Sequence, residues 1–315
     1  MHHLMKSLAA GAALPVLAVA PVAAQQTVPG AFALAGGEGS VTGQMIVTET
    51  MPLTATLTLT FADAATGKQI TDFTAELTQE LHVLAVDSSL TRLVHEHVKT
   101  ANSEGVFSTQ MQFPAPGNYH IYADAVPEGR GQQVLRFDVA ISGDADAGEP
   151  ALQHFGVGDE IAVASGDYEV RIDPSQLAAD EETMLHVAVL KDGAPATDLH
   201  PYLGVAAHAV LVKAGDLSYV HAHPMEDSQP MEHDGHGAHD DPALHREGHG
   251  DHAAPAPAGK APDHDHGHGN MMATVSPYMT LFITPPGAGD YTLFLEFIGG
   301  DEVHTIAVPL ELPAA

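Results

Sequence analysis

The chain contains no cysteine in its 315 residues. No disulfide can therefore contribute to its stability, which has to come from packing, although an oxidising compartment would permit such bonds. No thiolate is available as a metal ligand either, and this excludes blue-copper electron transfer. Any metal ion would have to be bound by histidine, methionine or carboxylate side chains.

Basic side chains are also scarce, since 11 Lys and Arg residues stand against 41 Asp and Glu residues, for a net charge of −30. A chain this acidic repels phosphate groups, so we expect no nucleic-acid partner and no stable insertion into a membrane. Cations are attracted, although the same charge is also typical of an exported protein that is simply kept soluble. The 22 histidines carry more information because they are far from evenly placed.

The first 24 residues have the pattern of a Sec-type signal peptide. One early lysine precedes an apolar stretch from Leu8 to Ala20, which is too short to span a bilayer, and small residues lead to a cleavage site expected after Ala24. No later apolar run is long enough for a transmembrane helix. We therefore expect a periplasmic or secreted protein.

Short runs of alternating apolar and polar residues, such as Thr54–Phe61, Gln132–Val139 and His304–Leu312, predict an all-β protein. An internal duplication is visible between the two halves. Residues 67–97 match residues 193–223 without a gap, and Pro116-Gly-Asn-Tyr119 later matches Ala288-Gly-Asp-Tyr291. Two copies of one unit fit two tandem immunoglobulin-like or cupredoxin-like β-sandwiches. We expect a signal peptide at 1–24, an N-terminal segment at 25–40, a first sandwich at 41–143, a linker at 144–158, and a second sandwich at 159–315 with an insertion at 224–270.

Each copy carries three histidines at the same spacing. In the second copy, Gly215 and Asp216 suit a two-residue type II′ turn, which would place His208 opposite His223 and on the same side as His221. Opposed side chains on antiparallel strands have Cβ atoms about 5 Å apart, near enough to share one ion. The first copy repeats the arrangement with His82, His95 and His97. The alternative is that these are structural histidines of the core, which a change of register by one residue would require.

An acidic residue follows the shared Gly-x-Tyr in each copy, Asp124 in the strand Tyr119–Val126 and Glu296 in the strand Tyr291–Phe297. Either could be a fourth ligand, could orient a ligating imidazole, or could simply face solvent. His120 is a weaker candidate because Thr292 replaces it in the second copy.

The insertion at 224–270 is a low-complexity segment, read as a disordered loop, whose composition could not build a core. Its histidines could wrap around Zn²⁺, Cu²⁺ or Ni²⁺ with modest affinity, could titrate as a pH sensor, or could be incidental to an acidic linker. They are His233, His236, His239, His245, His249, His252, His264, His266 and His268. Four methionines, Met225, Met231, Met271 and Met272, flank or lie in this segment. Thioether beside imidazole suits Cu(I), and imidazole favours Cu(II) among divalent ions, so copper in either oxidation state is the first expectation, with zinc or nickel after it.

These motifs resemble a group of bacterial exported proteins with a repeated His…His-x-His hairpin. The second copy shows the pattern as His208, Gly215-Asp216, His221-Ala-His-Pro224, Gly289-Asp-Tyr291 and Glu296, whereas the first has Val98 in place of the proline. The resemblance implies a β-sandwich and a part in heavy-metal, often copper, handling. The loop is also similar in composition to the His/Asp-rich loops of solute-binding subunits of zinc importers.

The sequence thus favours a periplasmic metal-binding protein that buffers, sequesters or delivers copper or zinc, with a metal transporter or chaperone as a possible partner. One alternative is an adhesion or scaffold module with incidental histidines. Another is a His-ligated metalloenzyme, since three histidines and an open position can activate water. There is no Ser-His-Asp arrangement, no His-Glu-x-x-His and no Gly-rich phosphate loop, so we expect no enzymatic activity.

Overall fold

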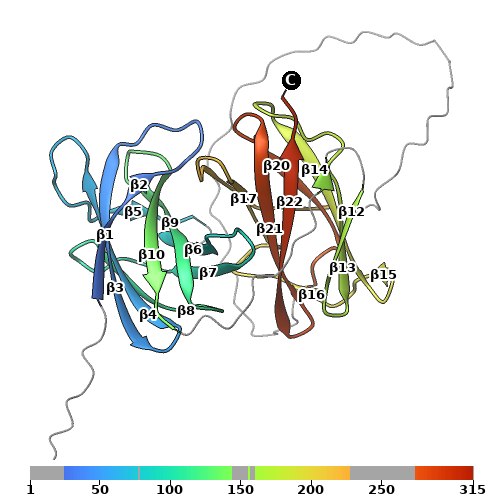
Figure 1. Cartoon of the computed structure of the whole chain (residues 1–315), viewed down its shortest axis with the longest axis horizontal. Helices are drawn as coiled ribbons and strands as arrows, with labels where there is room; N and C mark the ends of the chain where they lie inside the picture. Colours follow the sequence, from blue (N-terminus) through green and yellow to red (C-terminus); the bar gives the residue numbers. More distant parts are fainter. Residues whose placement is uncertain (1–24, 77–78, 144–154, 157–159, 228–273, 315) are drawn as a thin grey trace, which may run out of the picture.

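The computed structural model describes residues 25–76, 79–143, 155–156, 160–227 and 274–314 (Figure 1). All regular secondary structure in these residues is β-strand, and the strands form two sandwiches of two sheets each. The predicted fold class, tandem β-sandwiches from an internal duplication, is therefore confirmed. None of the described segments contains a helix long and apolar enough to cross a membrane. The predicted signal peptide, most of the predicted linker and the histidines of the insertion lie outside the described residues.

The first sandwich pairs a four-stranded sheet with a six-stranded sheet. The four-stranded sheet has the order β1 (Gln25–Pro29), β3 (Val41–Met51), β4 (Thr54–Asp63) and β8 (Val106–Gln112). The other has the order β2 (Ala31–Phe32), β10 (Gln133–Ile141), β9 (Gly117–Pro127), β6 (Leu81–Asp87) and β7 (Leu93–Val98), and β5 (Phe73–Thr74) also pairs with β9. The segment at 25–40 thus supplies a strand to each sheet.

The second sandwich has two six-stranded sheets. One has the order β11 (Phe155–Gly156), β22 (Glu302–Leu312), β21 (Gly289–Gly299), β17 (His208–Lys213) and β18 (Tyr219–Ala222), with β16 (Leu199–His200) also on β21. The other has the order β12 (Ile161–Ser165), β13 (Tyr168–Asp173), β14 (Thr183–Lys191), β20 (Tyr278–Ile283) and β19 (Met225–Asp227), with β15 (Ala194–Pro195) on β14. The first residues of the predicted insertion therefore form an edge strand.

Strand alternation explains how each core forms. In β4 the residues Leu57, Leu59 and Phe61 point inward and are fully buried, while the intervening threonines stay partly exposed. The equivalent strands of the two sandwiches also occur in the same order, since β10-β9-β6-β7 corresponds to β22-β21-β17-β18. The duplication seen in the sequence is thus a duplication of strand topology.

A third apolar cluster lies between the two sandwiches. Strand β6 is buried on both faces, because Leu81, Val83 and Ala85 enter the core of the first sandwich, while Leu84 and Val86 pack against the second. The residues that this interdomain cluster draws from the second sandwich are Val210, Val212, Tyr219 and Phe294. The sheet that contains β6, β7 and β9 therefore faces the sheet that contains β17 and β21 (Figure 1).

Two further contacts fix this interface. The rings of Tyr122 and Tyr219 stack across it with centroids 4.9 Å apart, and the Tyr122 hydroxyl donates to the carbonyl of Leu217 at 3.0 Å. The backbone N–H of Tyr219 donates to the carbonyl of Ala33, and the N–H of Ala35 donates to the carbonyl of Tyr219. The N-terminal segment of the first sandwich is thus hydrogen-bonded to β18 of the second.

Candidate metal centre

Two hairpins position the predicted histidine ligands. His82 on β6 pairs directly with His97 on β7. In the other hairpin Ala209 pairs with Ala222, and the same alignment carried one residue further sets His208 against His223. The register predicted from the sequence is therefore confirmed in both hairpins, and each set of three histidines shares one face of its sheet.

The predicted type II′ turn is wrong. Four residues, Ala214 to Leu217, form the loop between Lys213 and Ser218, and the N–H of Lys213 donates a hydrogen bond to the carbonyl of Ser218 at 3.0 Å. Leu217 has the positive φ, at 59°, and Gly215 does not. A loop that is longer by one residue on each side keeps the same centre, so the strands still meet in the predicted register.

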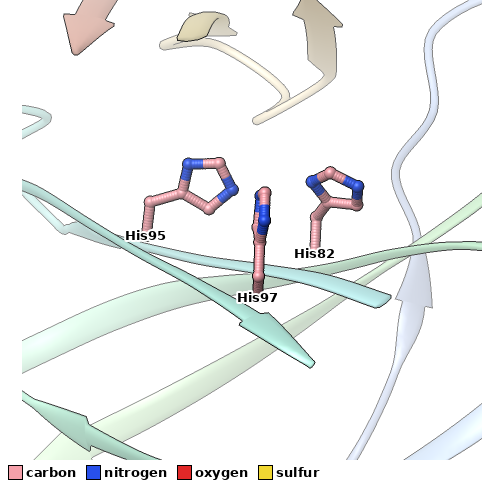
Figure 2. Close-up of side chains that lie close together, drawn as sticks. All are labelled: His82, His95 and His97. Atoms are coloured by element: carbon pink, nitrogen blue, oxygen red, sulfur yellow. The ribbon is translucent and has the colours of Figure 1, made fainter. Parts of the chain in front are cut away.

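Each set of three histidines converges tightly, and we call them triad 1 (His82, His95, His97) and triad 2 (His208, His221, His223). Within each triad one ring nitrogen per residue can be chosen so that all lie within 4.8 Å of one another. His82 and His208, at the centre of the interface, are only 2% and 1% exposed. Figure 2 shows the three rings of triad 1 standing together above β6 and β7.

The two triads are not separate sites, because the interface brings them face to face. The ring centroids of His95 and His208 are 4.7 Å apart, and those of His82 and His221 are 5.3 Å apart. These cross-domain distances fall within the range inside triad 1, where His82 lies 4.2 Å from His97 and 5.9 Å from His95 between ring centroids. The six rings therefore form one group, which we call the six-histidine cluster.

The two predicted acidic residues reach across the interface. Asp124 of the first sandwich lies 3.4 Å from Nδ1 of His221 in the second, and Glu296 of the second lies 3.2 Å from Nδ1 of His95 in the first. Both carboxylates are buried, so the solvent-facing interpretation is wrong. Each touches a histidine of the opposite triad as an orienting partner, an arrangement typical of ligating imidazoles.

Several buried ring nitrogens of the cluster make no hydrogen bond. Buried nitrogens normally have partners, but several here have none. Among the described residues, these atoms are both ring nitrogens of His82 and His97, and Nε2 of His95 and His223. A neutral imidazole has one N–H and one lone pair, so His82 and His97 each leave one lone pair without a partner, and converging lone pairs of this kind are the donor set that a metal ion requires.

Within triad 2, a ring nitrogen of His208 lies close to a ring nitrogen of His221. Nε2 of His208 lies 3.1 Å from the carbonyl of Tyr202, which can only accept, so Nε2 carries the proton and Nδ1 has the lone pair. Asp124 already accepts two hydrogen bonds from the Gln132 amide and accepts a third from Nδ1 of His221. When both rings are neutral, the remaining Nδ1 of His208 and Nε2 of His221 are two lone pairs facing each other at 3.4 Å.

Burial keeps most of these rings uncharged. Desolvation, followed by repulsion from neighbouring histidines, lowers the pKa of His208 to about 2 and that of His97 to about 3. The pKa values of His82 and His223 fall to about 4 for the same first reason, and that of His95 is also lowered by burial. Neutral imidazole is the form that binds metals, so these rings are ready to coordinate at neutral pH.

A cavity of about 360 Å³ reaches the cluster from outside. His221, Tyr219 and Ala35 line it together with the exposed acidic residues Asp180 and Glu182. A cation can approach His221 along this path.

Sequence reasoning placed the other candidates less well. His120 lies on the same sheet face as Asp124, but its ring bonds to Asp138 at 2.7 Å and takes no part in the cluster. The contributions of Tyr202 and Gln132, which hold His208 and Asp124, were missed. Glu76 pairs with Gln79 in the first sandwich, and Tyr202 pairs with Val205 at the equivalent position in the second. This equivalence is the one signal that points to Tyr202.

Comparison with known protein families gives a match to both halves of the chain. A family described as Domain of unknown function (DUF8832) matches residues 40–143 and 162–247, more than half of the chain, with one stretch in each sandwich. No curated protein matches the chain. The matched stretches contain both triads.

Proposed function

The chain belongs to the family described as Domain of unknown function (DUF8832), and from its own geometry we propose that it binds metal ions in the six-histidine cluster. Copper is the first choice and zinc the second. Its role would be to buffer, sequester or deliver the metal in the periplasm, without catalysis.

The observation that carries this proposal is the approach of Nδ1 of His208 to Nε2 of His221 at 3.4 Å, two nitrogens that both present lone pairs when the rings are neutral. Two nitrogens bound at about 2 Å to one tetrahedral ion are about 3.3 Å from each other. With both rings neutral, these lone pairs repel each other unless a metal ion or a proton lies between them, and the surrounding nitrogens without partners extend the same donor set. A purely structural histidine would instead have both of its nitrogens hydrogen-bonded.

The choice of metal follows from the donors. Six imidazoles without thiolate suit Cu²⁺, Zn²⁺ and Ni²⁺, and affinity within the divalent series is greatest for Cu²⁺. Exposed Met225 follows His223 by two residues and adds a thioether near the cluster in sequence, which favours copper as the cargo. The periplasmic location rests on the signal-peptide pattern, and sequencing the N-terminus of the mature protein would test it.

Metal titration tests the proposal directly. We expect the metal-free parent protein to bind copper with a saturable, tight stoichiometry. The variants His95→Ala with His97→Ala, and His221→Ala with His223→Ala, should each lose affinity at the altered triad by more than the roughly 10- to 100-fold that removal of an outer partner costs, and so bind less copper tightly than the parent. Elemental analysis combined with isothermal titration would measure this.

Two matched variants separate the cluster from other histidines. His120→Ala removes a histidine from the same sheet face outside the cluster and should bind like the parent protein. Deletion of residues 229–272 removes the histidine-rich segment, and the strands on either side can be rejoined because Asp227 pairs with Tyr278. This deletion should lower capacity and leave the tight binding in place. If the two triad variants bind like the parent, the cluster does not hold metal, and the scaffold interpretation is preferred.

The cavity allows a kinetic prediction. Asp180→Asn combined with Glu182→Gln should slow copper association about tenfold at low salt, because acidic side chains along an approach raise the local cation concentration. Stoichiometry should not change. The control is Asp301→Asn with Glu302→Gln, an equal loss of charge at residues that do not line the cavity. Stopped-flow measurements in which both double variants slow equally would show that only net charge matters.

A further inference from the structure

The six-histidine cluster has more donors than one ion needs. Copper and zinc ions bound by histidine usually take four ligands, and each triad already supplies three from one hairpin. Resting on the proposed function, we propose that the cluster binds two metal ions side by side, one per triad, with a small oxygen ligand such as hydroxide bridging them across the interface.

Each triad is complete within its own sandwich. Its three nitrogens lie within 4.8 Å of one another, and its residues come from two adjacent strands, with His223 directly after the end of β18. The register fixes this arrangement, since His82 faces His97 and His95 lies two residues along β7 on the same side. An ion can therefore occupy either triad without a ligand from the other sandwich.

The interface then places the two ions close together. Rings from opposite sandwiches approach as closely as rings from the same sandwich, with His97 and His208 at 5.4 Å between centroids. The supporting strands lie behind the rings on each side, so the open fourth position of each ion is directed toward the other triad. Ions in such paired centres are typically about 3.5–4 Å apart, a spacing that one bridging oxygen spans.

Each sandwich supplies a buried carboxylate that contacts a histidine of the other sandwich. Asp124 holds His221 and Glu296 holds His95, so each sandwich orients a ligand in the other's triad. Each carboxylate also lies directly opposite the buried histidine of its own sheet, Asp124 beside His82 and Glu296 beside His208. Two equivalent half-sites related by the duplication are the arrangement expected for a symmetric pair of ions, and a single ion would leave one half of these donors without a partner.

Copper(II) is the probe that distinguishes a coupled pair from separate ions. The full-length metal-free protein would be titrated with Cu²⁺ in excess glycine, which competes for weak sites, and followed by electron paramagnetic resonance. We expect two tightly bound ions. The signal should grow while the first site fills, and it should then fall, or broaden and gain a half-field transition, as the second ion couples to the first.

The outcomes are separable. If two ions bind and the signal doubles without change, the ions are independent and the bridged pair is wrong. If only one ion binds tightly, the two-ion centre is wrong although metal binding stands. If no ion binds tightly, the proposed function itself fails.

One variant serves as the matched control. His221→Ala with His223→Ala removes two of the three ligands of triad 2 and leaves triad 1 complete. It should bind one ion with an ordinary uncoupled signal, provided that circular dichroism shows the parent's strand content. A coupled signal in this variant would place the second ion outside the cluster and overturn the proposal.

Discussion

Without metal, this protein should lose most of its stability as the pH falls from about 7 to 4. The pKa of His82, lowered by burial from 6.5 to about 4, means that its ring stays unprotonated in the folded protein while the unfolded chain takes up a proton. The unfolded state then binds more protons, so the free energy of unfolding decreases as the pH falls through this window. For this one ring the loss is about 3 kcal/mol at pH 4, and His223 acts in the same direction.

Glu296 opposes part of this loss. Burial raises its pKa from 4.5 to about 7, so the folded protein binds its proton first and gains stability as the pH falls from about 7 to 4.5. Since at least four histidines shift in the destabilising direction, we expect a net loss of several kcal/mol, a large part of the 5–15 kcal/mol typical of a folded protein.

Urea unfolding at a series of pH values in the presence of a chelator would measure the effect. The comparison is the variant His82→Gln with His208→Gln, in which two neutral amides replace one buried ring of each triad. Its stability should depend less on pH between 7 and 4. A parent protein whose stability stays constant over this range would show that the rings are protonated or paired in the folded state.

The hairpin register was predictable because it depends only on counting. His208 and His223 are separated by a fixed number of residues, and any symmetric turn between them gives the same pairing. The turn type was not predictable in the same way. Gly215 favours a positive φ, yet the loop places Leu217 there, because Leu217 packs against the interdomain cluster and its carbonyl accepts the Tyr122 hydroxyl.

The sequence could not predict that the two triads lie against each other. Along β6, apart from His82, the run Leu81–Val86 is apolar on both faces, which is equally compatible with a core strand and with a strand covered by a second domain. Nothing in the run says what covers the face of Leu84 and Val86. Asp124 and Glu296 were found because they align in the two copies, but their partners are on the other sandwich, so no pattern within one copy could assign them.

Metal binding should stabilise both sandwiches as one unit. Each proposed ion has its three histidines in one sandwich, but the bridging oxygen joins the two ions across the interface, and the carboxylates that orient His95 and His221 also cross it. A ligand that binds only the folded state adds about 4 kcal/mol when it is present at 1,000 times its dissociation constant. In a protein of this size we expect an increase in Tm of roughly 8–16 °C on this basis, with a single unfolding transition.

Differential scanning calorimetry with and without copper would test this coupling. The variant His97→Ala with His223→Ala takes one ligand from each triad and leaves the tyrosine stack of the interface in place, so it should gain much less from the metal. If copper instead raises one of two transitions and leaves the other unchanged, the ion is held by one sandwich alone. We expect the Tm of both sandwiches to rise together in the parent protein and this joint increase to be lost in the variant. The reason is that Asp124 contacts His221 and Glu296 contacts His95 across the interface, so an ion that fixes His221 or His95 also fixes a carboxylate of the opposite sandwich.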